Sequence, residues 1–240
     1  MRVTKPLLHG RLVRRYKRFL ADVELDNGEQ LTAHCPNPGR MIGCSTPGSA
    51  VVLRDSEDPK RKLRYTLQTI REGETWINVD TGMPNQVLGE DYETVPELRG
   101  YSNAKREVKY GENSRIDLLL TDEERPDCYV EVKSTTMAQD GFGLFPDAVT
   151  ARGKKHLDEL IEVVRAGDRA VMFFFISRGD VERFAPADGI DPDYSNRLRE
   201  AAEAGVELLA WTSNVEADAL TLAKAVPVVL DQRIELETVR

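Results

Sequence analysis

The chain has 240 residues, enough for one large or two modest domains with buried cores. Hydrophobic residues make up 40% and charged residues 31%, as in ordinary folded proteins, which excludes large-scale disorder. The first residues lack the apolar core of a secretory signal peptide, and no apolar run is long enough to span a bilayer. These features predict a cytoplasmic protein with no membrane partner.

The charges are unevenly distributed along the chain. The net charge of -8 argues against a protein that coats nucleic acid, because coating requires a cationic surface. Residues 1–83 nevertheless carry 14 Lys and Arg against 10 Asp and Glu, whereas the remainder carries 19 against 31. The basic residues of the first part are therefore candidates for contacts with phosphate groups.

The cysteines offer little support for a disulfide or a zinc site. Cys35, Cys44 and Cys128 are an odd number without a CxxC pair, which argues against a disulfide framework and a four-cysteine zinc site. His9 and His34 lie within reach of Cys35 along the chain, but the usual spacings of zinc ligands are missing. We therefore expect reduced thiols and no zinc.

The first third of the chain is predicted to consist of short β-strands. Turn signals such as Asp26-Asn27-Gly28 and Pro47-Gly48 separate segments of mixed alternation. The expected strands cover residues 7–14, 18–25, 29–34, 49–55, 62–70 and 74–79. Because closure removes exposed strand edges, these strands predict a small closed barrel of the OB type. An SH3-like barrel would show the same periodicity.

From Pro84 onward, strands and helices alternate. The expected helices cover residues 84–92, 148–166 and 193–204, and the expected strands cover 103–110, 114–121, 127–134, 170–176 and 206–211. This order predicts an α/β (α+β) domain in which helices flank a mixed sheet. The sequence thus divides into a barrel domain, 1–83, and a sheet domain, 84–240.

Two strands of the second domain carry side chains suited to chemistry. Glu131 and Lys133 project to one face of their strand, because side chains alternate along a strand. Asp117 lies in an apolar run of the preceding strand, where a charged carboxylate needs a cation or hydrogen-bond donors. If the two strands pair as a hairpin, Asp117 and Glu131 approach each other. Such a pair predicts a site for Mg²⁺ or Mn²⁺, with Lys133 beside it to orient water or to stabilise a phosphate.

A third metal ligand is expected from the preceding helix, where Glu90 is the acid best placed by its order in the chain. An acid on a helix, then Asp117, then Glu131-x-Lys133 resembles the PD-(D/E)xK nuclease superfamily. Without the wider sequence, an exposed strand with a salt bridge would explain the same residues.

Longer segments resemble the sugar fermentation stimulation protein (SfsA) family. They are RRYKRFLADVE (14–24), HCPNPGRMIGC (34–44), PKRKLRYT (59–66), REVKYG (106–111), YVEVKSTT (129–136) and FPDAVTARGKKHL (145–157). The resemblance covers almost the whole chain. It implies an N-terminal OB-like β-barrel, a PD-(D/E)xK restriction-endonuclease-like domain, and DNA as the partner. Where the family commonly has Asn-Thr-Gly, this sequence has Asn37-Pro38-Gly39, so no donor role of that threonine carries over.

Basic residues interleaved with aromatic rings are the expected DNA-binding surface, since cations contact phosphates and rings stack on bases. The candidate DNA-binding residues of the barrel are Arg14, Arg15, Lys17, Arg18, Lys60, Arg61 and Lys62. Arg152 and His156 share one helical face and are expected to hold a phosphate near the metal. Solvation of the individual lysines, and packing of His156 in the interior, are the alternatives.

These observations predict a DNA-binding protein with a metal-dependent centre that hydrolyses phosphodiester bonds, with Asp117, Glu131 and Lys133 as catalytic residues. A DNA-binding regulator of sugar metabolism that does not cleave is the alternative, and a carbohydrate- or protein-binding module is a third interpretation. The intact acids and lysine favour cleavage, because a domain used only for binding has no physical need for paired carboxylates beside DNA.

Overall fold

The first six strands form a barrel in the computed structural model, which describes residues 1–111, 114–234 and 236. They are β1 (Leu7–Tyr16), β2 (Leu20–Leu25), β3 (Gln30–His34), β4 (Ala50–Asp55), β5 (Tyr65–Glu72) and β6 (Thr75–Asn78). Their order is β3-β2-β1-β4-β5-β6, with antiparallel neighbours. A parallel pairing of His34 with Thr66 joins β3 to β5 and closes the first five strands into a ring. The expected closed barrel is confirmed.

The turn between β2 and β3 illustrates how the local sequence shapes the barrel. The Asn27 side chain accepts a hydrogen bond from the Glu29 amide at 2.9 Å, and Gly28 adopts a φ of 85°, a left-handed conformation that suits glycine. The chain therefore reverses within a few residues and places alternate apolar side chains, such as Leu12, Val23 and Leu53, inside the ring.

A six-stranded mixed sheet forms the second part of the molecule. In the order of the sheet its strands are β15 (Leu220–Ala225), β14 (Glu207–Val215), β12 (Arg169–Ile176), β9 (Cys128–Thr135), β8 (Ser114–Thr121) and β7 (Asn103–Tyr110). The central strands β14, β12 and β9 are parallel to one another, and the outer pairings are antiparallel. The expected mixed sheet is confirmed.

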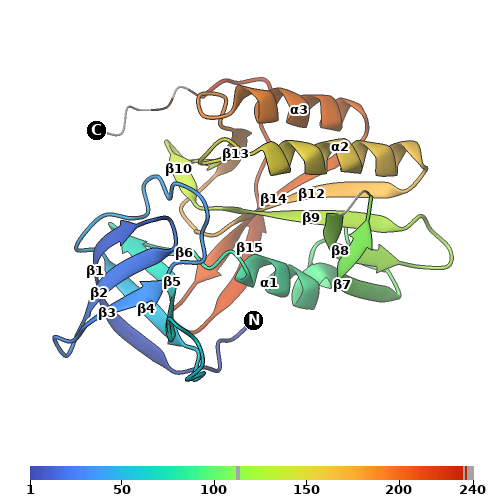
Figure 1. Cartoon of the computed structure of the whole chain (residues 1–240). Coiled ribbons are helices and arrows are strands. Elements are labelled where there is room, and N and C mark those ends of the chain that lie inside the picture. Colours follow the sequence, from blue (N-terminus) through green and yellow to red (C-terminus); the bar gives the residue numbers. More distant parts are fainter. Residues whose placement is uncertain (112–113, 235, 237–240) are drawn as a thin grey trace.

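Helices cover both faces of this sheet (Figure 1). The helices are α1 (Met83–Asp91), followed by the short η1 (Tyr92–Thr94), α2 (Ala151–Arg165) and α3 (Pro192–Glu203). Side chains of β12 enter two different cores: Phe174 packs on the side of α2 and α3, and Phe173 packs on the side of α1. Because both faces are covered, β12 is apolar along almost its whole length.

Four strands of the described residues were not expected from the sequence. Three of them, β10 (Met137–Gln139), β11 (Phe142–Phe145) and β13 (Arg183–Pro186), form a separate small sheet, and the fourth is the edge strand β15. The strands of the small sheet have only three or four residues, too few to show an alternation. The pairing of β11 with β13 also joins segments far apart in the chain.

The barrel and the sheet are joined by contacts distant in sequence. Met1 donates to the carbonyl of Leu220 at 3.1 Å, so the first residues lie against the sheet although they precede the barrel. Gln68 of β5 donates to the carbonyl of Ala217 at 2.9 Å. We propose that the chain divides into a barrel domain, 1–83, and a sheet domain, 84–240.

No helix in the described residues is long and apolar enough to cross a membrane.

Candidate active site

Asp117 and Glu131 converge where the β8–β9 ladder ends. The last pair of this antiparallel ladder is Leu118 with Val130, so the next residues along the two strands are Asp117 and Glu131. Asp117 Oδ2 accepts a hydrogen bond from the Val132 amide at 2.7 Å, and its Oδ1 accepts one from the Asn85 side chain of α1 at 2.6 Å. The expected hairpin is present, and it brings the two acids together.

The alternation of β8 breaks at Asp117. Ile116 belongs to the core on the α2 side, whereas Leu118 and Leu120 belong to the core on the α1 side. Asp117 thus lies between the two cores. Its carboxylate accepts the hydrogen bond of the Val132 amide, which a backbone carbonyl accepts in a regular ladder. This position gives the half-buried acid two donors, which its apolar neighbours could not supply.

Glu131 is buried and carries two different oxygens. Its Oε1 accepts a hydrogen bond from Lys133 Nζ at 2.7 Å and another from His156 Nδ1. Arg152 Nε donates to the second imidazole nitrogen of His156 at 3.2 Å, so the proton of His156 lies on Nδ1, facing Glu131. The other oxygen, Glu131 Oε2, is buried and has no hydrogen-bond partner among the described residues.

The electrostatic environment separates the two acids. Burial and the charge of Glu131 raise the pKa of Asp117 to about 7. Burial acts in the same direction on Glu131, but Lys133 and His156 outweigh it and lower the pKa of that carboxyl below its usual value. A divalent cation between the acids would relieve both the desolvation and the repulsion.

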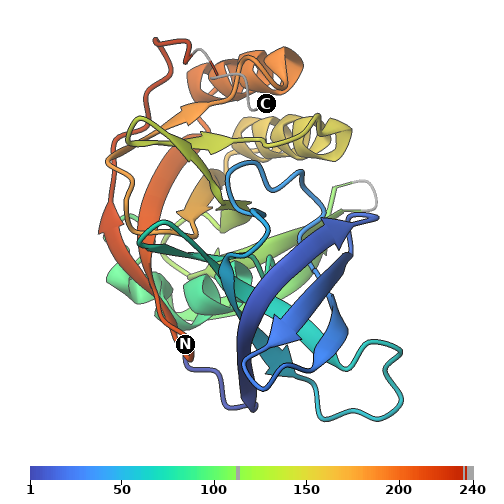
Figure 2. The same ribbon diagram turned by 90° about the vertical axis from the view of Figure 1, so that its left-hand side faces the viewer.

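A cavity of about 400 Å³, hereafter the carboxylate cavity, opens beside these residues. The sheet domain lines it with Asp117, Glu131, Lys133, Arg152 and His156, and with residues 145–150, which run from the end of β11 to the start of α2. The barrel contributes Arg18 and the loop residues 37–39. Figure 2 shows this blue loop reaching from the barrel toward α2. The cavity is therefore built from both parts of the molecule.

The barrel loop over the cavity, residues 36–41, is held from two sides. On the barrel side, the Arg15 guanidinium donates to the carbonyls of Asn37 and Gly39 at 2.9 and 2.8 Å. On the sheet side, Asp147 accepts a hydrogen bond from the Met41 amide at 2.7 Å. A Cβ atom at Gly39 would collide with the Asp147 carboxylate, so glycine permits the close approach.

The remaining residues that the sequence singled out lie in several places. Arg14 forms an ion pair with Asp22 at 2.8 Å. Lys17 and Arg18 are exposed in the turn between β1 and β2, and a second exposed group lies between β4 and β5, formed by Lys60, Arg61 and Lys62. Glu90 is not part of the cavity lining, and its carboxylate lies 4.0 Å from the N-terminal amine. The structure therefore does not bring Glu90 to the acid pair.

Sequence reasoning missed several contributions to the cavity, among them Asn85, Asp147 and the loop residues 37–39. Asp147 and the loop both fall in segments that resemble the SfsA family, which was a usable signal. Asn85 offered none, because an amide next to a proline at the start of a helix is common in proteins that lack such a site.

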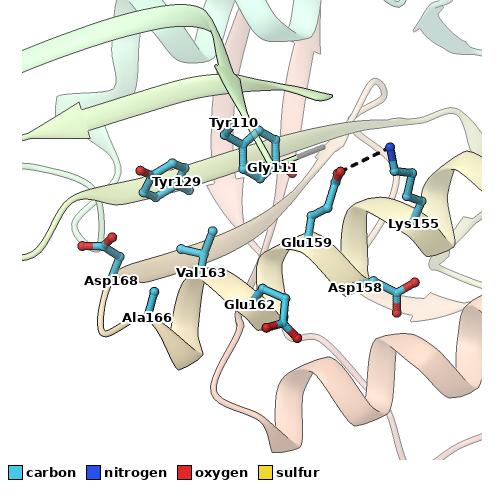
Figure 3. Close-up of a pocket in the computed structure, with 10 residues that line it drawn as sticks. All are labelled: Tyr110, Gly111, Tyr129, Lys155, Asp158, Glu159, Glu162, Val163, Ala166 and Asp168. Atoms are coloured by element: carbon cyan, nitrogen blue, oxygen red, sulfur yellow. Dashed lines mark ion pairs between the residues drawn. The ribbon is translucent and has the colours of Figure 1, made fainter. Parts of the chain in front are cut away.

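A second cavity, of about 520 Å³, lies further along α2, toward the C-terminal end of that helix (Figure 3). The rings of Tyr110 and Tyr129 form one wall. Its acids are Asp158, Glu159, Glu162 and Asp168. This concentration of carboxylates would repel a phosphate, so the cavity is unsuited to nucleic acid.

Comparisons with known proteins agree with this architecture. Residues 13–79 match the model of the SfsA N-terminal OB domain, and residues 82–219 match that of the sugar fermentation stimulation protein RE domain. A sugar fermentation stimulation protein homolog from Geobacter sulfurreducens is 52% identical over 95% of this chain and 98% of its own. A homolog from Geobacter metallireducens is 51% identical over 96% of this chain and 100% of its own.

A solved structure has the same fold over nearly the whole chain. SfsA from Pyrococcus furiosus, in complex with Ca²⁺, superposes with a TM-score of 0.84 at 28% identity and covers 95% of this chain and 99% of its own. The family models together match most of the residues, and the homologs match nearly the full length. The chain belongs to the sugar fermentation stimulation protein family.

Proposed function

We propose that this protein binds DNA and hydrolyses phosphodiester bonds with Mg²⁺ or Mn²⁺ held by Asp117 and Glu131. The observation that carries this proposal is the acid pair, buried Glu131 and half-buried Asp117, in a cavity that also contains Lys133 and two further basic residues, Arg18 and Arg152. Acids alone would repel DNA, and cations alone would only bind it. Their combination in one cavity suits a reaction at a phosphate group.

The acid pair fits a divalent metal. The donors are carboxylates, and Glu131 Oε2 is a buried acceptor with no partner among the described residues. In the described part of the chain, no group of three or more His, Cys, Asp or Glu side chains is positioned to hold a metal. A centre with two protein carboxylates, completed by water and phosphate oxygens, is a common arrangement for Mg²⁺. SfsA from Pyrococcus furiosus was solved in complex with Ca²⁺, a cation that prefers oxygen ligands, which supports a divalent cation as the ligand here.

When bound, the metal would polarise the phosphate and lower the pKa of a bound water. The protein residues have separate tasks. Asn85 fixes the orientation of Asp117, and His156 fixes that of Glu131. Lys133, whose side chain is 13% exposed, projects into the cavity and can hold the attacking water or a phosphate oxygen. Arg152 donates to His156 and adds positive charge to the same wall.

The exposed basic groups of the barrel would hold the DNA backbone. Arg18 lines the cavity itself, and Lys60, Arg61 and Lys62 lie on the exposed loop between β4 and β5. Arg15 differs from its neighbours, because its guanidinium is directed to backbone carbonyls of the loop over the cavity. We therefore assign Arg15 to the construction of the site rather than to a phosphate contact.

A gel assay tests this function. The protein is incubated with single-stranded, duplex and branched DNA in the presence of Mg²⁺, Mn²⁺ or EDTA. We expect cleavage of at least one DNA form with metal, none with EDTA, and none by Glu131→Gln. Tight DNA binding without metal-dependent cleavage of any form would replace this proposal with a regulator of sugar metabolism that binds DNA and does not cut it. If the protein bound no form of DNA, both the nuclease proposal and the regulator alternative would be wrong.

A further inference from the structure

The rings of Phe19 and His34 form a stacked pair on the surface of the barrel. Their centroids are 6.4 Å apart and their planes differ by 21°. Phe19 is 44% exposed, one of only three large hydrophobic side chains so exposed in the described residues. An exposed aromatic ring offers a face on which another flat ring can stack.

This ring pair leads directly to the carboxylate cavity. Arg18, which precedes Phe19, lines the cavity, and so does Asn37, which follows His34 by three residues. The carbonyl of Phe19 accepts a hydrogen bond from the Cys35 amide at 2.9 Å, so the two segments run side by side from the rings to the cavity. A strand of nucleic acid that contacts the rings can therefore continue to the acid pair.

Positive charge flanks the ring pair. Arg18 is exposed on the side of the cavity, and Arg61 is exposed on the loop between β4 and β5. Burial lowers the pKa of His34, and the positive charge of Arg61 acts in the same direction, whereas the charge of Asp80 opposes it. Proteins that bind single-stranded nucleic acid combine aromatic rings, on which bases stack, with positive side chains that contact the phosphates.

We infer that the Phe19–His34 pair is a subsite for an unpaired base, and that the substrate of the carboxylate cavity is single-stranded DNA. This inference rests on the proposed function. A ring can stack on the open face of a base only when that base is outside a duplex. The subsite thus selects a single strand and aligns it with the cavity.

The shape of the cavity favours the same substrate. Its volume of about 400 Å³ lies at the lower end of the range for pockets that hold one small ligand, so it has room for about one nucleotide. The loop over it is fixed by Arg15 on one side and by Asp147 on the other. The barrel and the sheet are therefore tied together at the cavity, and a cavity of this volume suits one nucleotide rather than a duplex.

Binding measurements in EDTA test the subsite without cleavage. Fluorescence anisotropy compares a labelled single strand with a duplex of the same sequence. We expect tighter binding of the single strand, a roughly 10-fold or greater loss in Phe19→Ala, and near-native affinity in Phe19→Trp. Val13→Ala is the matched control, because Val13 lies on the same barrel and is also 44% exposed. Equal affinity for both DNA forms, or Phe19→Ala behaving like Val13→Ala, would overturn the inference.

Cleavage assays with Mn²⁺ distinguish this inference from the proposed function. If duplex is cut as fast as single strand, and Phe19→Ala has no effect, the substrate assignment is wrong and the nuclease assignment stands. If a single strand binds through Phe19 but no DNA is cut, the nuclease assignment is wrong and the subsite for an unpaired base stands. A native protein that binds neither DNA form contradicts both.

Discussion

His156 donates a hydrogen bond to one oxygen of Glu131, while the other oxygen of that carboxylate is buried without a partner among the described residues. The bond fixes the orientation of the carboxylate and therefore the direction of the free oxygen. A buried acceptor without a donor is unfavourable, because it has lost its water. A metal ion at this position would supply the missing interaction.

We expect His156→Ala to weaken Mn²⁺ binding about 10- to 100-fold, because loss of a residue that orients a ligand typically has this effect. Isothermal titration calorimetry measures the affinity. Lys154→Ala is the control on the same helix, since the side chain of Lys154 is 46% exposed and pairs with Asp193. Equal Mn²⁺ affinity in His156→Ala and Lys154→Ala would contradict the role of His156.

We expect Asp117→Asn to lose Mn²⁺ binding, because the amide removes one of the two negative charges at the site. Glu90→Gln is the matched control and should bind Mn²⁺ as tightly as the native protein, since Glu90 lies outside the cavity. Both Asp117 oxygens accept hydrogen bonds, so thermal unfolding must be followed in parallel to show that the variant is folded. If Glu90→Gln lost Mn²⁺ binding and Asp117→Asn kept it, Glu90 rather than Asp117 would be the metal ligand.

We expect Lys133→Ala to abolish cleavage and to retain both DNA and metal binding. Lys133 lies beside the acid pair, whereas in the proposed function the barrel holds the DNA and the carboxylates hold the metal. Single-turnover cleavage rates and anisotropy measure the two properties separately. A variant that cuts at the native rate would remove Lys133 from the mechanism.

The basic residues of the barrel should separate into two groups. Replacing Lys60, Arg61 and Lys62 with alanine should flatten the slope of log K against log salt by roughly 0.7 to 0.9 for each phosphate that is no longer neutralised. Arg15→Ala should instead lower the melting temperature and leave the salt slope unchanged, because Arg15 donates to loop carbonyls. If Arg15→Ala reduced the salt slope and kept the native melting temperature, Arg15 would instead be a DNA-contacting residue.

An ion pair at the junction of the two parts should contribute to stability. Asp180 accepts from Arg178 at 2.6 and 2.7 Å and from Thr75 of β6 at 2.9 Å. Because Asp180 is 40% exposed, solvent screening limits the loss in Asp180→Asn to about 1 kcal/mol.

This contribution should depend on pH. Arg178 holds the pKa of Asp180 below its usual value, so the stabilisation is complete above the pKa of the unfolded chain, about 4, and is lost as the pH falls through the folded value. Urea unfolding at pH 7 and pH 3 measures the difference between native protein and Asp180→Asn. A difference that stays constant between these two pH values would rule out this ion pair as its source.

The sequence by itself determined most of the secondary structure and the core of the candidate site. Residues 170–176 form an uninterrupted apolar run, and a strand so composed must be buried on both faces. Asp117 and Glu131 lie on adjacent strands joined by a short turn, so their approach follows from the pairing of neighbours in the chain. These features depend on residues close in sequence, whose spacing is fixed by the geometry of the strand.

Only the tertiary structure decided which other side chains reach the site. Asn85 and Glu90 lie on the same helix, but the packing of α1 on the sheet directs Asn85 to Asp117 and leaves Glu90 beside the N-terminus. Arg15 resembles its basic neighbours in sequence, yet it supports the loop over the cavity. The cavity joins segments separated by about a hundred residues, as in the contact of Met41 with Asp147. Such contacts form when whole helices, strands and loops pack together. The local pattern of residues predicts each element but not how the elements pack.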